Sequence, residues 1–102
     1  MHIVILITCA SKEEAEKIAN ALVETKLAAC VNIAGGVNSV FRWQGKLDKA
    51  EEILLIAKTQ ENKLAAVIDK VKSLHSYEVP EIIALPVVGG NTDYLKWIDE
   101  SR

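Results

Sequence analysis

Residues 75–81 hold the densest group of polar side chains in the sequence, with a histidine, a tyrosine and two glutamates. A neutral imidazole nitrogen of His75 can bind a divalent transition metal, with Glu78 or Glu81 as an oxygen ligand or as the partner that orients the ring. The alternative is a structural role, in which His75 ends a helix and interacts with its last carbonyl groups. The residues alone leave both interpretations open.

The two cysteines, Cys9 and Cys30, offer a second kind of metal ligand. They are too few for a disulfide framework and lack the Cys-x-x-Cys pairing of zinc and redox sites. Cys30 follows small residues in a predicted strand, which indicates a buried, unreactive thiol. Cys9 ends the first predicted strand, where we expect partial exposure and a better soft ligand. His75 and Cys9 are therefore the candidate metal ligands.

Aromatic and charged residues lie on two further predicted strands. Phe41 and Trp43 alternate with polar residues and so share one face, which is typical of core or interface packing and alternatively of a ligand platform. Glu52 and Lys58 flank an apolar strand centre, where charges are usually solvated but can line a cleft at a subunit boundary. No Ser-His-Asp or Cys-His arrangement with an orienting group can be read from the spacings, so we predict no catalytic residues and no enzyme.

Composition restricts the class of protein. The chain has 102 residues, of which half are apolar and a quarter charged, so we expect one folded domain over residues 1–102 and not a disordered chain. The net charge of -2 gives no basic footprint for nucleic acid or for an anionic membrane surface. No apolar run reaches the ~20 residues of a membrane span, and no signal peptide can be recognised. These features predict a soluble, cytoplasmic protein.

Apolar patterning predicts the elements that must position these residues. The expected strands are His2–Thr8, Ala28–Trp43 with a bend or bulge at Gly35–Gly36, one ending in Ile53–Ala57, and Ile82–Leu85. The first helix begins at the N-cap Ser11, with Glu14 completing a capping box. The apolar stripes of the two longer helices are Ala15, Ile18, Ala19, Leu22 and Val23, and then Leu64, Val67, Ile68, Val71 and Leu74. A last helix begins at Asn91 or Thr92.

The resulting order, β-α-β-β-α-β plus a terminal helix, predicts an α+β, ferredoxin-like antiparallel sheet with helices on one face. Three of its strands, at 3–7, 53–57 and 82–85, are apolar on both faces. Leaving half a dozen such side chains in water would forfeit on the order of 10 kcal/mol. We therefore expect another copy of the chain to cover the second face. A monomer with an apolar open face is the alternative.

This fold class hosts many functions, and the residues exclude several. A metallochaperone needs two cysteines after the first strand, where this chain has only Cys9. A bacterial-type ferredoxin needs four cysteines per cluster. An RNA-recognition domain needs aromatic residues on its central strands, and residues 53–57 include none.

Several segments together resemble the CutA divalent-cation tolerance family, in its order and over essentially the whole chain. They are Leu27–Asn32, Phe41–Lys46, Glu52 through Lys58–Thr59, His75–Ile82 and Asp93–Trp97. The resemblance implies a PII-like homotrimer of ferredoxin-like subunits, associated with tolerance to copper and other divalent metals, and no established reaction. It also implies a ligand cleft between subunits built from Cys30, Trp43, Glu52, Lys58, His75, Tyr77, Glu81, Tyr94 and Trp97.

Copper binding in some family members involves the histidine that matches His75 and a cysteine at the end of the first strand. In this chain that cysteine position falls at Thr8, and Cys9 follows one residue later with its side chain on the opposite face. Ser76 stands where the family usually has proline, and Phe41 where it usually has tyrosine.

Our preferred hypothesis is a homotrimeric protein of the metal response, binding Cu²⁺, another divalent metal or a small ligand in its inter-subunit clefts, with no obligatory cofactor and no nucleic-acid or membrane partner. The alternatives are an enzyme with an uncharacterised small-molecule substrate at the interface, and a trimeric anchoring or scaffold protein.

Overall fold

The structure is a computed structural model that describes residues 1–101; Arg102, the last residue of the predicted domain, lies outside the described residues. It has a mixed α+β architecture in the predicted element order. The elements are β1 (His2–Cys9), α1 (Lys12–Glu24), β2 (Cys30–Trp43), β3 (Lys46–Gln60), a short 3-10 helix (Glu61–Lys63), α2 (Leu64–Leu74), β4 (Ile82–Pro86) and α3 (Thr92–Ser101). The four strands form one antiparallel sheet in the order β2-β3-β1-β4.

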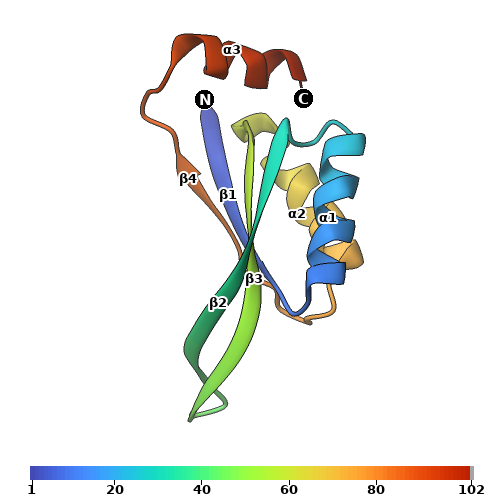
Figure 1. The fold of residues 1–102 in the computed structure, drawn as a ribbon, viewed down its shortest axis with the longest axis vertical. Helices are drawn as coiled ribbons and strands as arrows, with labels where there is room; N and C mark the ends of the chain where they lie inside the picture. Colours follow the sequence, from blue (N-terminus) through green and yellow to red (C-terminus); the bar gives the residue numbers. More distant parts are fainter. Residues whose placement is uncertain (102) are drawn as a thin grey trace.

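Helices α1 and α2 pack side by side on one face of the sheet, and α3 lies across the end of the sheet near the N-terminus (Figure 1). The core lies between the two long helices and the strands. Its largest fully buried apolar side chains are Ile5, Ile7, Ile18, Leu22, Leu55, Val67 and Val71. Most of the predicted apolar stripe of α1 is therefore confirmed, but Val23 is wrong, because its side chain is 41% exposed beyond the edge of the core.

The first helix begins as its sequence predicts, although its capping box is only half formed. The backbone N–H of Glu14 donates to the hydroxyl of Ser11, 3.2 Å away. In a full capping box the Glu14 carboxylate would accept from the backbone of Ser11. Here that carboxylate instead accepts from Ser76, which lies beyond α2. The residue is thus diverted from helix capping to the loop after α2.

Strands β2 and β3 form a long hairpin that extends away from the rest of the fold (Figure 1). Its tip is a two-residue turn in which Gln44 and Gly45 both have positive φ, 51° and 77°, as a type I′ hairpin requires. The predicted irregularity in β2 is confirmed as a register shift between Ala34 and Val37, where Gly36 has a φ of 72°. The bulge lets the hairpin bend away from the sheet.

One face of the sheet is covered by α1 and α2, and the opposite face, here called the outer face, is apolar but incompletely covered. Its central side chains are Val4, Leu6, Leu54, Ile56, Ile83 and Leu85. None of these six is fully buried, and Ile83 and Leu85 are 50% and 48% exposed.

Within residues 1–101, no helix is both long enough and apolar enough to cross a membrane.

We expect truncation of Leu55 to destabilise the fold far more than the same truncation of Leu47 on the same strand. Leu55 is fully buried, whereas Leu47 is 69% exposed. Leu55→Ala should lower the free energy of unfolding by about 2–5 kcal/mol, and Leu47→Ala by about 0.5 kcal/mol or less. Chemical denaturation at one fixed protein concentration checks this, and equal losses would contradict the assignment of the core.

Candidate functional site

His75 follows the last residue of α2, where the structural alternative places it, but its side chain does not cap the helix. Its backbone N–H donates to the carbonyl of Val71 at 2.9 Å. Its ring reaches the end of β1, where Nε2 lies 2.7 Å from the carbonyl oxygen of Thr8. The ring therefore ties the loop after α2 to the first strand, and its other nitrogen, Nδ1, is left for a different partner.

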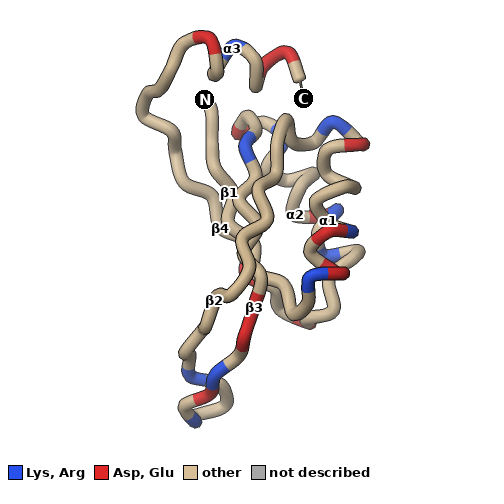
Figure 2. The backbone as a smooth tube through the Cα atoms, in the orientation of Figure 1, with Lys and Arg blue, Asp and Glu red and all other residues tan. Residues whose placement is uncertain are grey.

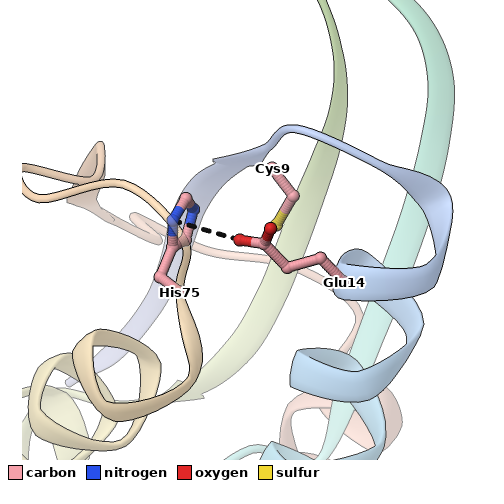
Figure 3. A group of neighbouring side chains, drawn as sticks. All are labelled: Cys9, Glu14 and His75. Carbon is pink, nitrogen blue, oxygen red and sulfur yellow. Dashed lines mark ion pairs between the residues drawn. The ribbon is translucent and has the colours of Figure 1, made fainter.

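Cys9, Glu14 and His75 bring three potential metal ligands together (Figure 3). The thiol, a carboxylate oxygen and a ring nitrogen all lie within 4.8 Å of one another. The structure thus places the two candidate metal ligands, His75 and Cys9, close together, and metal binding by them stays a prediction; two details of their expected surroundings differ. Cys9 is fully buried instead of partly exposed, because its side chain faces the helices. The carboxylate at His75 belongs to Glu14 instead of Glu78 or Glu81.

Glu14 is held in this position by the loop itself. Its carboxylate accepts from the backbone N–H of Ser76 at 3.1 Å and from the Ser76 hydroxyl at 2.7 Å. The same carboxylate lies 3.1 Å from Nδ1 of His75. Ser76 is the residue that stands where proline is usual in the resembled family, and here it supplies two donors that proline lacks.

The contact between His75 and Glu14 joins two atoms that are both hydrogen-bond acceptors in their usual states. Nε2 lies against the Thr8 carbonyl and so carries the proton of a neutral ring, while Nδ1 accepts from the backbone N–H of Tyr77 at 3.0 Å. An ionised carboxylate 3.1 Å from that lone pair needs a positive charge between them. A metal ion between them would supply that charge, but it would first have to displace the Tyr77 N–H from Nδ1.

The Cys9 thiol completes the group in its protonated form. Burial, reinforced by the negative charges of Glu14 and Glu52, raises the pKa of Cys9 to about 12. A metal ion must displace this proton to bind the sulfur, so its affinity would rise with pH. In its protonated form the thiol is unreactive.

A cavity of about 660 Å³ lies on the outer-face side of the β2–β3 hairpin, beside the loop after α2. It is lined by Thr8, Ser39, Val40, Phe41, Trp43, Asp48, Glu52, Tyr77, Glu78, Val79 and Glu81. Four of the nine predicted cleft residues are among them, namely Trp43, Glu52, Tyr77 and Glu81. We call this the acidic pocket.

Tyr77 connects the acidic pocket with the potential metal ligands. Its hydroxyl donates to Glu52 at 2.9 Å, and its ring lies 4.8 Å from the ring of His75, centroid to centroid. Burial, followed by the hydrogen bond to Glu52, raises the pKa of Tyr77 to about 12. The hydroxyl therefore stays protonated and keeps donating to Glu52 at neutral pH.

Of the other five predicted cleft residues, His75 lies beside the pocket with Cys9 and Glu14, and the remaining four, Cys30, Lys58, Tyr94 and Trp97, form a second group near α3. Tyr94 and Trp97 stack with their centroids 5.5 Å apart. Burial, together with the neighbouring Cys30, raises the pKa of Tyr94. Lys58 pairs with Cys30 in the β2–β3 register and donates to Asn32. Cys30 is half-buried, so the expectation of a fully buried thiol is not met.

One chain therefore does not bring the nine predicted cleft residues together. Glu52 lies in the first group and Lys58 in the second, six positions along β3, which is about 20 Å of strand. Sequence reasoning also missed Glu14 as a potential metal ligand and Asp48 in the acidic pocket. One signal for Glu14 was available in the sequence. The capping pattern at Ser11 places Glu14 in the first turn of a helix that begins soon after Cys9, so the two side chains could be expected to lie close together.

We expect Cys9 to resist alkylation in the folded protein. In a Cys30→Ala variant, iodoacetamide at about pH 8 should modify the single remaining thiol only after denaturation, because a buried, protonated thiol is a poor nucleophile. Mass spectrometry of native and denatured samples checks this. Rapid modification of Cys9 in the native sample would show that its thiol is accessible. The Cys9→Ala variant reports on Cys30 separately.

Comparison with known proteins gives one family. The model of the CutA1 divalent ion tolerance protein family matches residues 3–101. The chain is 50% identical over 101 residues to the divalent-cation tolerance protein CutA of Thermus thermophilus, covering 99% of this chain and 98% of that protein. It is 48% identical over 99 residues to chloroplastic protein CutA 1 of Oryza sativa, covering 97% of this chain and 56% of that protein.

A solved structure agrees with this assignment. The structure named as the periplasmic divalent cation tolerance protein CutA of Archaeoglobus fulgidus superposes with a TM-score of 0.96 at 50% identity, covering 99% of this chain and 98% of that one. These names refer to different compartments, so the cytoplasmic location stays a prediction. They describe tolerance to divalent cations, and none names a reaction. The chain belongs to the CutA1 divalent ion tolerance family.

Proposed function

We propose that this chain forms a PII-like homotrimer of ferredoxin-like subunits that serves the response to divalent metals, copper included, by binding a metal ion or a small ligand without catalysing a reaction. The observation that carries the metal part is the convergence of thiol, carboxylate and imidazole at Cys9, Glu14 and His75. The names of the relatives, which describe tolerance to divalent cations, support it.

The three side chains fit a transition metal better than a hard cation such as Mg²⁺. Sulfur and imidazole nitrogen are ligands that copper and zinc prefer, whereas magnesium takes oxygen. The hydrogen bond from Nε2 of His75 to the Thr8 carbonyl is the outer-shell contact that usually orients a metal-binding histidine. Three protein ligands also leave a coordination position open for water or a small ligand.

The trimer is supported by two independent features of the single chain. The outer face exposes about half of Ile83 and Leu85, which a neighbouring copy would bury. The predicted cleft residues form two groups about 20 Å apart along β3, so a complete cleft needs the first group of one copy to meet the second group of another. Such head-to-tail contacts between different surfaces close into a ring when the rotation from copy to copy returns to the first copy.

Light scattering of the purified protein should give a mass of about 34 kDa, three times the 11.2 kDa chain. Ile83→Lys should dissociate the assembly, because it places a charge in the apolar outer face. Val23→Lys is the matched control, since Val23 lies on α1, on the opposite side of the sheet, and is similarly exposed. A wild-type particle of 11 kDa would contradict the trimer.

Titration of Cu²⁺ by calorimetry, without oxygen, tests the metal ligands. We expect His75→Ala, Glu14→Gln and Cys9→Ser each to weaken binding by at least about tenfold, because each removes a ligand atom. His2→Ala is the control, since His2 is the other histidine and bonds Leu95 and Asp99 instead. Equal affinities in the wild type and His75→Ala would remove His75 from the site.

A further inference from the structure

We propose that the acidic pocket binds a linear aliphatic polyamine, an organic cation with ammonium groups spaced along a methylene chain. This inference rests on the proposed function, because it names the class of small ligand for one wall of the proposed cleft. It does not depend on metal binding at Cys9, Glu14 and His75, which lie behind Tyr77.

The charged side chains that line the acidic pocket all have the same sign. They are Asp48, Glu52, Glu78 and Glu81, and among residues 1–101 no lysine, arginine or histidine is part of the lining, although Lys46 and Lys49 lie nearby on the hairpin, opposite Trp43 and Val40. Acidic residues also follow one another on β3 above the mixed charges of the hairpin tip (Figure 2). Charges of one sign in a concave site raise the local concentration of the opposite ion. The pocket therefore selects cations.

Glu52 shows that, among residues 1–101, no ion pair compensates the buried negative charge of the pocket. The residue is only 8% exposed, so its carboxylate is largely removed from water. One oxygen accepts from the hydroxyl of Tyr77, which is neutral, and no described basic side chain forms an ion pair with it. A buried carboxylate without a cationic partner is costly. A ligand ammonium group at this position would relieve that cost.

The aromatic side chains indicate an organic cation. Phe41 and Trp43 line the pocket and are 37% and 56% exposed in the single chain, so their rings form part of the pocket wall. Aromatic faces attract ammonium groups and also pack against methylene groups. An inorganic cation, with its hydration shell, gains little from such walls. A chain of methylenes with terminal ammonium groups gains binding free energy twice, by packing its methylenes against the aromatic rings and by pairing its ammonium groups with the carboxylates.

The spacing of the carboxylates favours an extended cation over a single metal ion. Within residues 1–101, the group of three or more potential ligands close enough to share an ion is Cys9, Glu14 and His75, and the pocket carboxylates form no such group. Dispersed carboxylates match charges that are themselves dispersed. In a trimer, Lys58 of another copy could enter the cleft, but it would bring one positive charge against four negative ones.

Calorimetric titration with octane-1,8-diamine tests the proposal on the wild-type protein. Octane-1,8-diol has the same chain length without charge, and Mg²⁺ has two charges without a chain. We expect the diamine to bind at least about tenfold more tightly than either control, because neither control combines charge with apolar contact. Equal binding of the diol, equal binding of Mg²⁺, or no binding of the diamine would overturn the proposal.

Two variants locate the site. Glu52→Gln keeps the shape of the side chain. It should weaken binding of the diamine about tenfold or more, because a charge-assisted hydrogen bond is lost. Glu51→Gln removes the same charge at the adjacent, exposed position outside the pocket and should change affinity less than about twofold. If both variants weaken diamine binding equally, the overall negative charge of the protein, and not the pocket, attracts the diamine.

The same samples separate this proposal from the proposed function. Glu52→Gln should weaken diamine binding far more than Cu²⁺ binding, and His75→Ala should weaken Cu²⁺ binding while keeping a diamine preference over the diol. Loss of copper binding with retained diamine binding would remove the metal function alone. If the protein has the 34 kDa mass and binds Cu²⁺ but does not bind the diamine, the polyamine proposal alone is removed.

Discussion

Three consecutive side chains anchor the loop after α2, and the arrangement of both sites depends on them. His75 bonds the carbonyl of Thr8, Ser76 bonds Glu14, and Tyr77 bonds Glu52, at 2.7, 2.7 and 2.9 Å. Ordering a loop costs roughly 1–2 kcal/mol per residue in backbone entropy, and hydrogen bonds to charged acceptors, worth about 1.5–3 kcal/mol each, offset part of that cost. The loop conformation is therefore set by contacts between its own side chains and acceptors on β1, α1 and β3.

The alternation of strand side chains explains why the two sites lie on opposite faces of the sheet. On β1 the odd positions through Cys9 face the helices and are buried, so the thiol meets Glu14 and His75 there. Thr8 and Glu52 belong to the other face and line the acidic pocket. The loop after α2 passes around the end of the sheet between them. One short segment can thus supply His75 to one face and Tyr77 to the other.

The parts of the fold that local patterns control were predictable from the sequence. The Ser11 cap and the irregularity near Gly35–Gly36 depend on nearby residues, and the structure confirms them. The role of Glu14 was not predictable, because its partners lie 61 and 62 positions away, across α2. The exposure of Cys9 was wrong for the same reason, since a strand end is exposed unless distant elements cover it. Strand spacing alone could not show that the expected cleft residues form two groups.

The geometry of the ligands, more than their charge, distinguishes the cations that each site can accept. A transition metal needs donors that converge on one point at about 2.0–2.3 Å, which Cys9, Glu14 and His75 approach and the dispersed pocket carboxylates do not. The two sites are nevertheless connected through one backbone group, because Nδ1 of His75 already accepts from the N–H of Tyr77. A single lone pair cannot serve both that N–H and a metal ion. A metal bound at Nδ1 would therefore displace the N–H of Tyr77, whose hydroxyl bonds Glu52 in the acidic pocket, so occupancy of one proposed site would change the wall of the other.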